Sequence, residues 1–170
     1  MKHSIGIIGL GFVGDALKNG FEHFGINGVA VHDPKMGSSI SDVIDSSVVF
    51  ICVPTPMKNG GYIDDSIVNS VLNELDDANY DGIIVIKSTL LPTSVRKFIN
   101  KYQKLRIATN PEFLTERRAR EDFINTEWII LGGDSKDTDE LKKLYQFVYR
   151  SSPHNIAYSE ITAESAMMVK

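Results

Sequence analysis

The sequence predicts a doubly wound parallel sheet with helices on both faces, which is a three-layer α/β/α fold. Three observations lead to this fold class. Short β-branched runs alternate with segments of helical period, a glycine-rich turn joins the first run to the first helix, and 42% of the 170 residues are hydrophobic. The alternation favours parallel strands, and the length and composition suit one domain with its own core.

Six segments are predicted to form the strands because each is short, apolar and rich in β-branched residues. Helical segments between them would carry the chain back along the sheet, so that neighbouring strands run parallel. The predicted strands are Ser4 to Ile8, Gly28 to His32, Val48 to Val53, Ile83 to Ile86, Leu105 to Ala108 and Trp128 to Leu131.

Three amphipathic helices are predicted from apolar residues that recur at intervals of three and four positions. Their apolar stripes would pack against the sheet. The crossover over residues 33–47 has room for only a turn or two of helix. The three stripes are Val13, Ala16, Leu17, Phe21 and Phe24; Ile67, Val68, Val71, Leu72 and Leu75; and Leu141, Leu144, Tyr145 and Val148.

The net charge and the cysteine content indicate which binding partners and which cellular compartment to expect. A net charge of -4 provides no basic field for a phosphate backbone, so we expect no nucleic-acid partner. The single cysteine, Cys52, excludes an intramolecular disulfide and a multi-cysteine metal site, and it fits a reducing, cytoplasmic compartment. The longest apolar run, Val48 to Val53, is far shorter than the roughly 20 residues of a membrane span, so we expect no membrane association.

The glycine-rich turn from Gly9 to Gly14 has the pattern G-x-G-x-x-G between a predicted strand and a predicted helix. Gly9 would make the tight turn, Gly11 would let the backbone approach a pyrophosphate, and Gly14 would let helix and strand pack closely. Phe12 and Val13 would lie beside the ligand at the helix N-terminus, where free N–H groups favour an anion. The pattern predicts a Rossmann-type dinucleotide site; the alternative is a glycine turn without a ligand.

Asp33 ends the second predicted strand and lies 24 residues beyond Gly9. An acid roughly 20 residues beyond the first glycine accepts hydrogen bonds from the ribose hydroxyls, and it would repel a 2′-phosphate. The cofactor is therefore expected to be NAD. Two alternatives stay open: Asp33 could form a turn before Pro34, and Lys35 could meet the phosphate of NADP.

Three later segments follow predicted strands: Val53-Pro54-Thr55-Pro56, Lys87-Ser88-Thr89-Leu90-Leu91-Pro92-Thr93 and Asn110-Pro111-Glu112-Phe113-Leu114-Thr115-Glu116. Together, in this order, they resemble the UDP-glucose/GDP-mannose dehydrogenase family, over essentially the whole chain but only that family's amino-terminal domain. Ligands of open parallel sheets lie at the carboxyl ends of the strands, which independently places these segments near one crevice.

The resemblance implies NAD-dependent oxidation of the C6 alcohol of a UDP-sugar to the acid, in nucleotide-sugar metabolism and polysaccharide biosynthesis. Val53, Pro54 and Thr55 would contact the cofactor, and Thr89 would border the reaction centre and hold a water. From the residues alone, Thr55 fits a plain turn and Thr89 could cap the helix near Pro92.

Asn110 and Pro111 suit the first positions of a helix, which would put Glu112 and Glu116 on one face, a turn apart. The alternative is a solvated charged helix, since Glu116 and Arg120 have i,i+4 spacing. By resemblance, Glu112 performs general acid/base work through water, and Glu116 contacts cofactor and substrate. Phe113 and Leu114 would contact the substrate beside them.

Lys170 resembles the family lysine that stabilises the oxyanion of the reacting sugar. The residues from Ala163 onward favour a helix without a stop signal, so we expect a fragment: an NAD-binding domain over 1–158, then 159–170 as the start of a helix leading to an absent substrate and dimerisation domain. The fragment alone is expected to be inactive and a weak dimer or monomer, and the full protein a homodimer. Cys52 does not match the family nucleophile and is expected to be a small buried residue.

The sequence departs from the family pattern in ways that leave the substrate open. The crossover after Asp33 is short, Arg117 replaces a common glycine, and Trp128 lies where arginine is frequent. GDP-mannose or UDP-N-acetylmannosamine dehydrogenases share these motifs, and a non-catalytic NAD-binding module is a rival of another class. The histidines, His3, His23, His32 and His154, match nothing catalytic.

Overall fold

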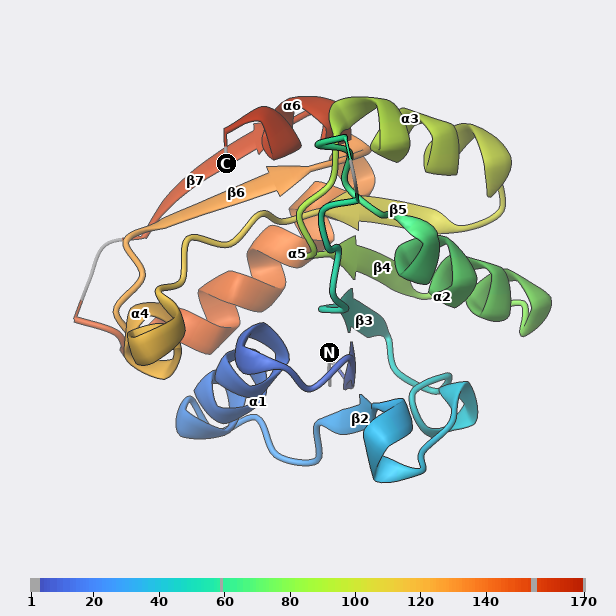
Figure 1. Ribbon diagram of the computed structural model, residues 1–170. Coiled ribbons are helices and arrows are strands. Elements are labelled where there is room, and N and C mark those ends of the chain that lie inside the picture. Colours follow the sequence, from blue (N-terminus) through green and yellow to red (C-terminus); the bar gives the residue numbers. More distant parts are fainter. Residues whose placement is uncertain (1–3, 59, 154–155, 170) are drawn as a thin grey trace.

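A seven-stranded sheet forms the centre of the computed structural model, which describes residues 4–58, 60–153 and 156–169 (Figure 1). Its strand order is β2-β1-β3-β4-β5-β6-β7. The order reverses direction at β1, because the chain passes first to β2 on one side and then to β3 on the other. The strands are β1 Ile5–Ile8, β2 Ala30–His32, β3 Val48–Ile51, β4 Ile83–Ile86, β5 Arg106–Thr109, β6 Trp128–Gly132 and β7 Ala157–Ile161.

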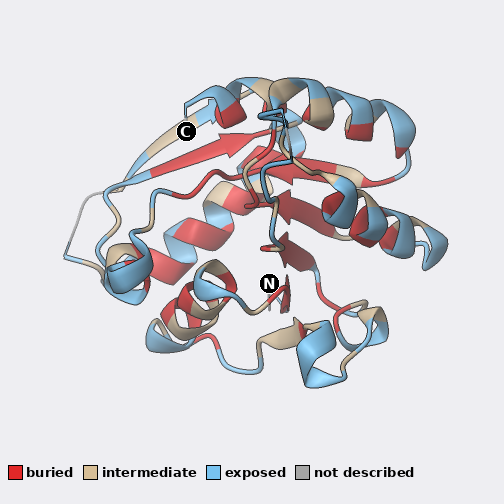
Figure 2. Ribbon diagram, in the orientation of Figure 1, coloured by how far each residue is buried: buried red, intermediate tan, exposed pale blue. Residues whose placement is uncertain are grey.

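Helices cover both faces of the sheet, which confirms the predicted three layers (Figure 1). The first face carries α1 Phe12–His23, α4 Ala119–Ile124 and α5 Ser135–Val148, and the second carries α2 Ser66–Asp77, α3 Pro92–Lys101 and α6 Ala163–Met168. The three predicted apolar stripes fall on α1, α2 and α5. Strands β1, β3 and β4 are buried at every position, as Figure 2 shows.

The sheet is mostly parallel, as predicted, but the pairing of β5 with β6 departs from the prediction. Strands β2, β1, β3, β4 and β5 are parallel, whereas β6 pairs antiparallel with β5 and β7 runs parallel to β6. After Thr109 the chain does not cross back over the sheet. The segment 110–127, with α4, continues beyond the carboxyl end of β5, so β6 starts beyond that end and runs back toward it, where Gly132 pairs with Thr109.

Strand β7 escaped the sequence analysis because it lacks an apolar run. Its sequence is AYSEI, and its residues are intermediate or exposed at the edge of the sheet. The domain boundary expected between residues 158 and 159 falls inside this strand. The division into two domains stays a prediction.

The crossover from β2 to β3 contains only two short 3-10 turns, η1 Pro34–Met36 and η2 Ile40–Asp42. These turns agree with the predicted turn or two of helix. Strand β2 lies at the edge of the sheet, next to β1. The reversal of strand order between β1 and β3 opens a crevice at their carboxyl ends, where open α/β sheets bind ligands. Among the helices in the described ranges, none is long and apolar enough to cross a membrane.

Candidate active site

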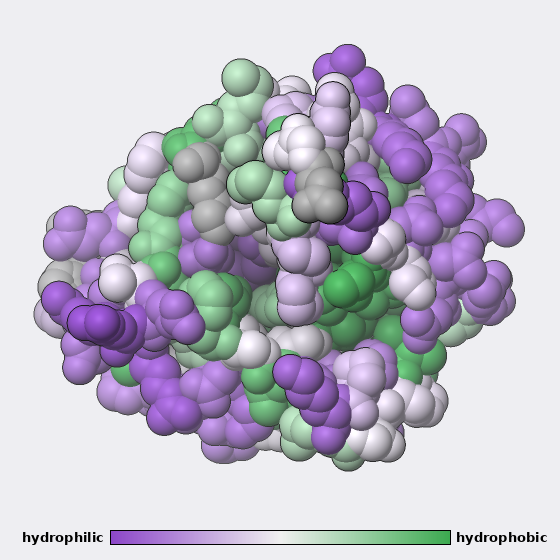
Figure 3. Space-filling model, viewed as in Figure 1, coloured by the Kyte–Doolittle hydropathy of each residue, from purple (hydrophilic) through white to green (hydrophobic). Residues whose placement is uncertain are grey.

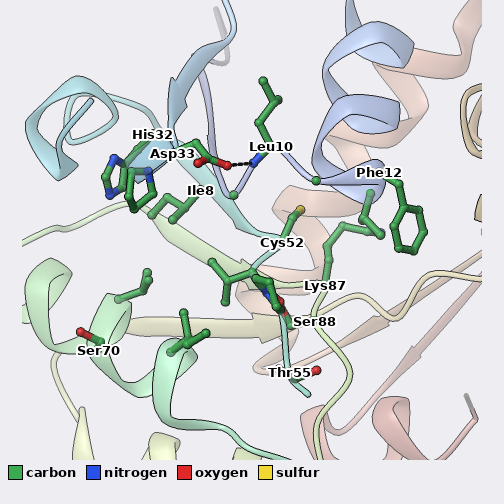
Figure 4. A pocket seen from close by; sticks show the side chains of 18 of the residues that line it. Ile8, Leu10, Phe12, His32, Asp33, Cys52, Thr55, Ser70, Lys87 and Ser88 are labelled. Carbon is green, nitrogen blue, oxygen red and sulfur yellow. Dashed lines mark hydrogen bonds between the residues drawn. The ribbon is translucent and has the colours of Figure 1, made fainter. Parts of the chain in front are cut away.

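A cleft of about 610 Å³ lies at the carboxyl ends of β1, β2, β3 and β4 (Figure 4). The reversal of strand order therefore coincides with this cleft, and the sequence motifs converge on it. The predicted site residues that line it are Gly9, Gly11, Phe12, Val13, Asp33, Lys35, Val53, Pro54, Thr55, Thr89 and Glu112.

The glycine turn has the geometry that its sequence predicts. Gly9 has a φ of +90°, in the region that favours glycine, and its N–H donates to the carbonyl of His32 at 2.8 Å. A Cβ on Gly14 would lie 2.0 Å from the carbonyl oxygen of Gly9, so only glycine lets α1 pack so close to β1. A Cβ on Gly11 would meet nothing within 4 Å, because this position faces open space at the cleft.

Asp33 fastens the glycine turn to the end of β2. Its carboxylate accepts from the backbone N–H of Leu10 at 2.7 Å (Figure 4). It also accepts from the backbone N–H of Lys35 at 2.9 Å. These two hydrogen bonds hold the pKa of Asp33 below its ordinary value of 3.8, so the group is ionised near neutral pH. Asp33 thus shapes the turn as well as lining the cleft, a structural role that the spacing rule did not anticipate.

The ends of β3 and β4 are tied together by Ser88, whose hydroxyl donates to the carbonyl of Val53 at 2.7 Å. Thr55 and Thr89, the residues beyond these strands, both line the cleft. Thr89 does not cap α3: the residue before Pro92 is Leu91, and no side chain caps that helix. The capping alternative for Thr89 is therefore wrong.

The helix predicted from Asn110 and Pro111 is absent. Residues 110–115 are irregular, a 3-10 turn covers Glu116–Arg118, and α4 starts only at Ala119. Glu112 and Glu116 therefore do not share a helical face. Glu112 is buried, and its carboxylate accepts from the N–H of Leu114 at 2.7 Å, whereas Glu116 is exposed and does not line the cleft.

Asn110 fails to start a helix because its side chain is engaged inside the protein. The amide oxygen accepts from the ammonium of Lys87 at 2.8 Å and from the hydroxyl of Tyr145, while the amide nitrogen donates to the carbonyl of Ile130 at 2.7 Å. All three side chains are buried, so these bonds are shielded from water. We call Lys87, Asn110 and Tyr145 the asparagine hub.

The asparagine hub was missed by the sequence analysis, although Lys87 and Asn110 were part of quoted motifs. The signal that could have identified it was the presence of polar residues directly after two buried strands. The third partner, Tyr145, comes from α5, and the sequence analysis treated it only as a residue of the apolar stripe. Lys87 and Glu112 line both the cleft and a second, smaller cavity of about 70 Å³ that contains Asn110, Phe113 and Trp128. They therefore lie at the boundary between the two.

Cys52 lies on the floor of the cleft and is 8% exposed. Burial raises the pKa of its thiol to about 12; the positive charge of Lys87 opposes that rise and the negative charge of Glu112 adds to it. The expectation of a small buried residue is confirmed.

Three other predicted residues, Phe113, Leu114 and Glu116, do not line the cleft. Phe113 and Leu114 line the smaller cavity, and the ring of Phe113 is parallel to that of Trp128, with centroids 6.3 Å apart. Glu116 does not pair with Arg120, which instead binds Asp15 on α1 at 2.7 Å. Lys170 lies outside the described residues, as do His3 and His154.

Comparison with known proteins gives a consistent picture. Residues 35–150 match the UDP-glucose/GDP-mannose dehydrogenase family, NAD binding domain. UDP-glucose 6-dehydrogenase of Rickettsia bellii is 34% identical over 126 residues, which are 71% of this chain and 29% of that protein. GDP-mannose 6-dehydrogenase of Pseudomonas aeruginosa is 30% identical over 142 residues, 75% of this chain and 31% of that protein. The chain thus spans about 29% of the Rickettsia relative's length.

Solved structures share the fold over the full length of the chain. A ternary complex of GDP-mannose dehydrogenase from Pseudomonas aeruginosa has a TM-score of 0.78 at 25% identity, covering 100% of this chain and 48% of that one. A UDP-glucose dehydrogenase from Pyrobaculum islandicum also has a TM-score of 0.78, at 20% identity, covering 98% of this chain and 48% of that one.

Proposed function

The chain belongs to the UDP-glucose/GDP-mannose dehydrogenase family, and on this premise we propose that it is the NAD-binding part of an enzyme that oxidises the C6 alcohol of UDP-glucose to the acid. The observation that carries the proposal is the convergence of the glycine turn, Asp33, Thr55, Thr89 and Glu112 on one cleft at the reversal of strand order. A dinucleotide site and a buried carboxylate share that cavity.

The residues of the cleft fit NAD. The open space at Gly11 admits a pyrophosphate against backbone N–H groups at the start of α1, where the helix dipole favours negative charge. Asp33, ionised and at the end of β2, would accept from ribose hydroxyls, and Thr55 and Thr89 would flank the nicotinamide end. When bound, NAD supplies the hydride acceptor, and the protein supplies placement and electrostatics.

Glu112 is proposed as the acid/base group and Thr89 as the residue that holds a water beside it. The N–H of Leu114 fixes the Glu112 carboxylate at the boundary between the cleft and the smaller cavity, which gives it one defined position. The carboxylate would take up, through water, the proton that the reacting alcohol loses as it is oxidised. Glu116, Phe113, Leu114 and Lys170 stay proposals for substrate contacts.

A second candidate substrate is GDP-mannose, favoured by the 30% identity to the Pseudomonas aeruginosa GDP-mannose 6-dehydrogenase. Because this chain spans 29% to 31% of those relatives' lengths, residues outside it would select the sugar nucleotide. We propose that the 170 residues alone bind NAD without forming NADH from UDP-glucose, that they are monomers or weak dimers, and that the whole enzyme is a cytoplasmic homodimer.

Calorimetric titration with NAD and NADP tests the cofactor site. We expect NAD to bind more tightly than NADP, because Asp33 would repel the 2′-phosphate, and we expect Asp33→Ala to weaken NAD binding by about tenfold to a hundredfold. Asp81→Asn is the matched control, since Asp81 is exposed before β4, at the opposite end of the sheet. Equal affinities for both cofactors, or an Asp33→Ala variant that binds as the parent does, would refute the role of Asp33.

A further inference from the structure

Helix α2 presents two stripes of side chains, and only one of them belongs wholly to the core. Val68, Leu72 and Leu75 are fully buried against the sheet. A second stripe lines the cleft and has the three- and four-residue spacing of one helical face. This second stripe, which we call the α2 wall, consists of Ile67, Ser70, Val71 and Glu74.

The α2 wall faces the chain that leaves β2. Pro34 and Lys35 of η1 line the same cleft, next to Asp33. Figure 4 shows Asp33 and His32 at the same end of the cleft as Ser70, with Phe12 and Lys87 at the other end. Figure 3 shows a strongly hydrophobic hollow in the region between α2 and the β2 segment. The hollow therefore has apolar sides and a carboxylate, Glu74, among the residues that line it.

The proposed function determines which part of the cofactor would enter this hollow. Thr89 and Glu112 would lie at the nicotinamide end and the glycine turn would hold the pyrophosphate, while Asp33 would bind the adenosine ribose. The adenine base extends beyond that ribose, away from the reaction end. The space left for it is the one between η1 and the α2 wall.

We propose that the α2 wall is a base-recognition site specific for a 6-aminopurine, in which the Glu74 carboxylate accepts a hydrogen bond from the exocyclic amine. Ile67 and Val71 would contact the flat face of the base, as apolar walls of ligand sites do. The hydroxyl of Ser70 lies 3.4 Å from one carboxylate oxygen of Glu74 and orients the group. The inference rests on the proposed function.

A carboxylate is a pure acceptor when ionised, so the site distinguishes an amine from a carbonyl at the same ring position. Adenine donates there, whereas hypoxanthine presents a C6 oxygen that the Glu74 carboxylate would repel, and its nearest N–H donor lies one ring position away, at N1. Nicotinamide hypoxanthine dinucleotide differs from NAD at this position of the base and keeps the ribose, pyrophosphate and nicotinamide. It is therefore a probe of Glu74 that leaves the glycine turn and Asp33 in use.

The test is calorimetric titration of the 170-residue chain with NAD and with nicotinamide hypoxanthine dinucleotide. We expect NAD to bind about fivefold to tenfold more tightly, the effect of one hydrogen bond to a charged acceptor at a solvent-exposed rim. In Glu74→Gln the side-chain amide can either accept or donate, so the two affinities should become equal. Asp76→Asn, two positions along α2 and outside the cleft, is the matched control and should keep the difference.

The outcomes separate this inference from the function on which it rests. If the chain binds NAD but the two dinucleotides bind equally, or if the difference persists in Glu74→Gln, the α2 wall does not recognise the amine and the inference is wrong. If neither dinucleotide binds, the proposed NAD site fails and the inference fails with it. A difference that disappears only in Glu74→Gln supports both.

Discussion

The two ends of the cleft are held in shape by different kinds of interaction. At the glycine turn, the contacts are between backbone groups and one partly exposed carboxylate, Asp33, within a segment of regular strand and helix. At the Glu112 end, the asparagine hub holds an irregular loop; its buried side chains come from the residues after β4 and β5 and from α5. The comparison teaches that a motif of recognised spacing identifies the first end, whereas the second depends on side-chain partners that no motif connects.

The largest expected effect comes from removing the asparagine hub. In Asn110→Ala, buried groups of Lys87, Tyr145 and Ile130 each lose a hydrogen-bond partner, so we expect the free energy of unfolding to fall by about 3 kcal/mol or more. Urea unfolding followed by circular dichroism measures it. Asn73→Ala on the exposed side of α2 is the matched control, with a change of about 0.5 kcal/mol or less. Equal stability of the two variants would show that the hub does not hold this end.

The difference between the two ends also explains what the sequence could and could not predict. The glycine turn, Asp33 and the α1 stripe were predicted because each follows a recognised spacing: the G-x-G-x-x-G pattern, an acid roughly 20 residues further on, and apolar residues every three or four positions. The helix at Asn110 was predicted wrongly because local capping preference was outweighed by Lys87 and Tyr145, which are 23 and 35 residues away. Strand β7 was missed because an edge strand needs no apolar run once β6 supplies its backbone partners.

A pair of glycine variants sharpens the contrast within the glycine turn. Gly14→Ala places a methyl group against the carbonyl oxygen of Gly9, so we expect stability to fall by about 1–3 kcal/mol together with NAD affinity. Gly11→Ala places its methyl in open space, so the fold should keep its stability while NAD binding weakens. Thermal melts and cofactor titrations of both variants measure this. A Gly11→Ala variant that binds NAD as the parent does would mean that the pyrophosphate does not approach Gly11.

Loss of the proposed proton acceptor, Glu112, should leave the glycine-turn end unchanged. In a complete enzyme that contains this chain, Glu112→Gln keeps the shape but removes the acceptor, so turnover should fall by about a hundredfold or more at nearly unchanged NAD affinity. Steady-state kinetics with a parallel NAD titration measure both quantities. Undiminished turnover would show that Glu112 only shapes the loop through Leu114.

A smaller effect is expected from acid at the glycine turn. Because the pKa of Asp33 is lowered in the folded chain, its charge stabilises the turn above the ordinary pKa of 3.8, and this stabilisation is lost as the pH falls below that value through the folded pKa. The stability difference between the parent and Asp33→Asn should therefore be present at neutral pH and vanish in acid. A difference independent of pH would show that the charge of Asp33 contributes nothing to the turn.

The smallest effect is expected at the ion pair between α4 and α1. Arg120 on α4 binds Asp15 on α1 at 2.7 Å, but the two side chains are 60% and 38% exposed to solvent. Exposed ion pairs add little to stability. Thermal melts of Arg120→Gln should coincide with those of the parent within error. A clear drop in melting temperature would mean that this pair, rather than the core beneath it, joins α1 to α4.

Because the Cys52 thiol is buried, its chemical labelling reports how often the folded chain opens. Burial raises the pKa of this thiol to about 12, so at pH 7 the folded chain holds it as the unreactive thiol, and its side chain is 8% exposed. An unfolded chain would present an ordinary, reactive thiol at the same position. Cys52 is the single cysteine in the sequence. The rate at which a maleimide labels the protein therefore measures how often the chain opens, and no engineered cysteine is needed.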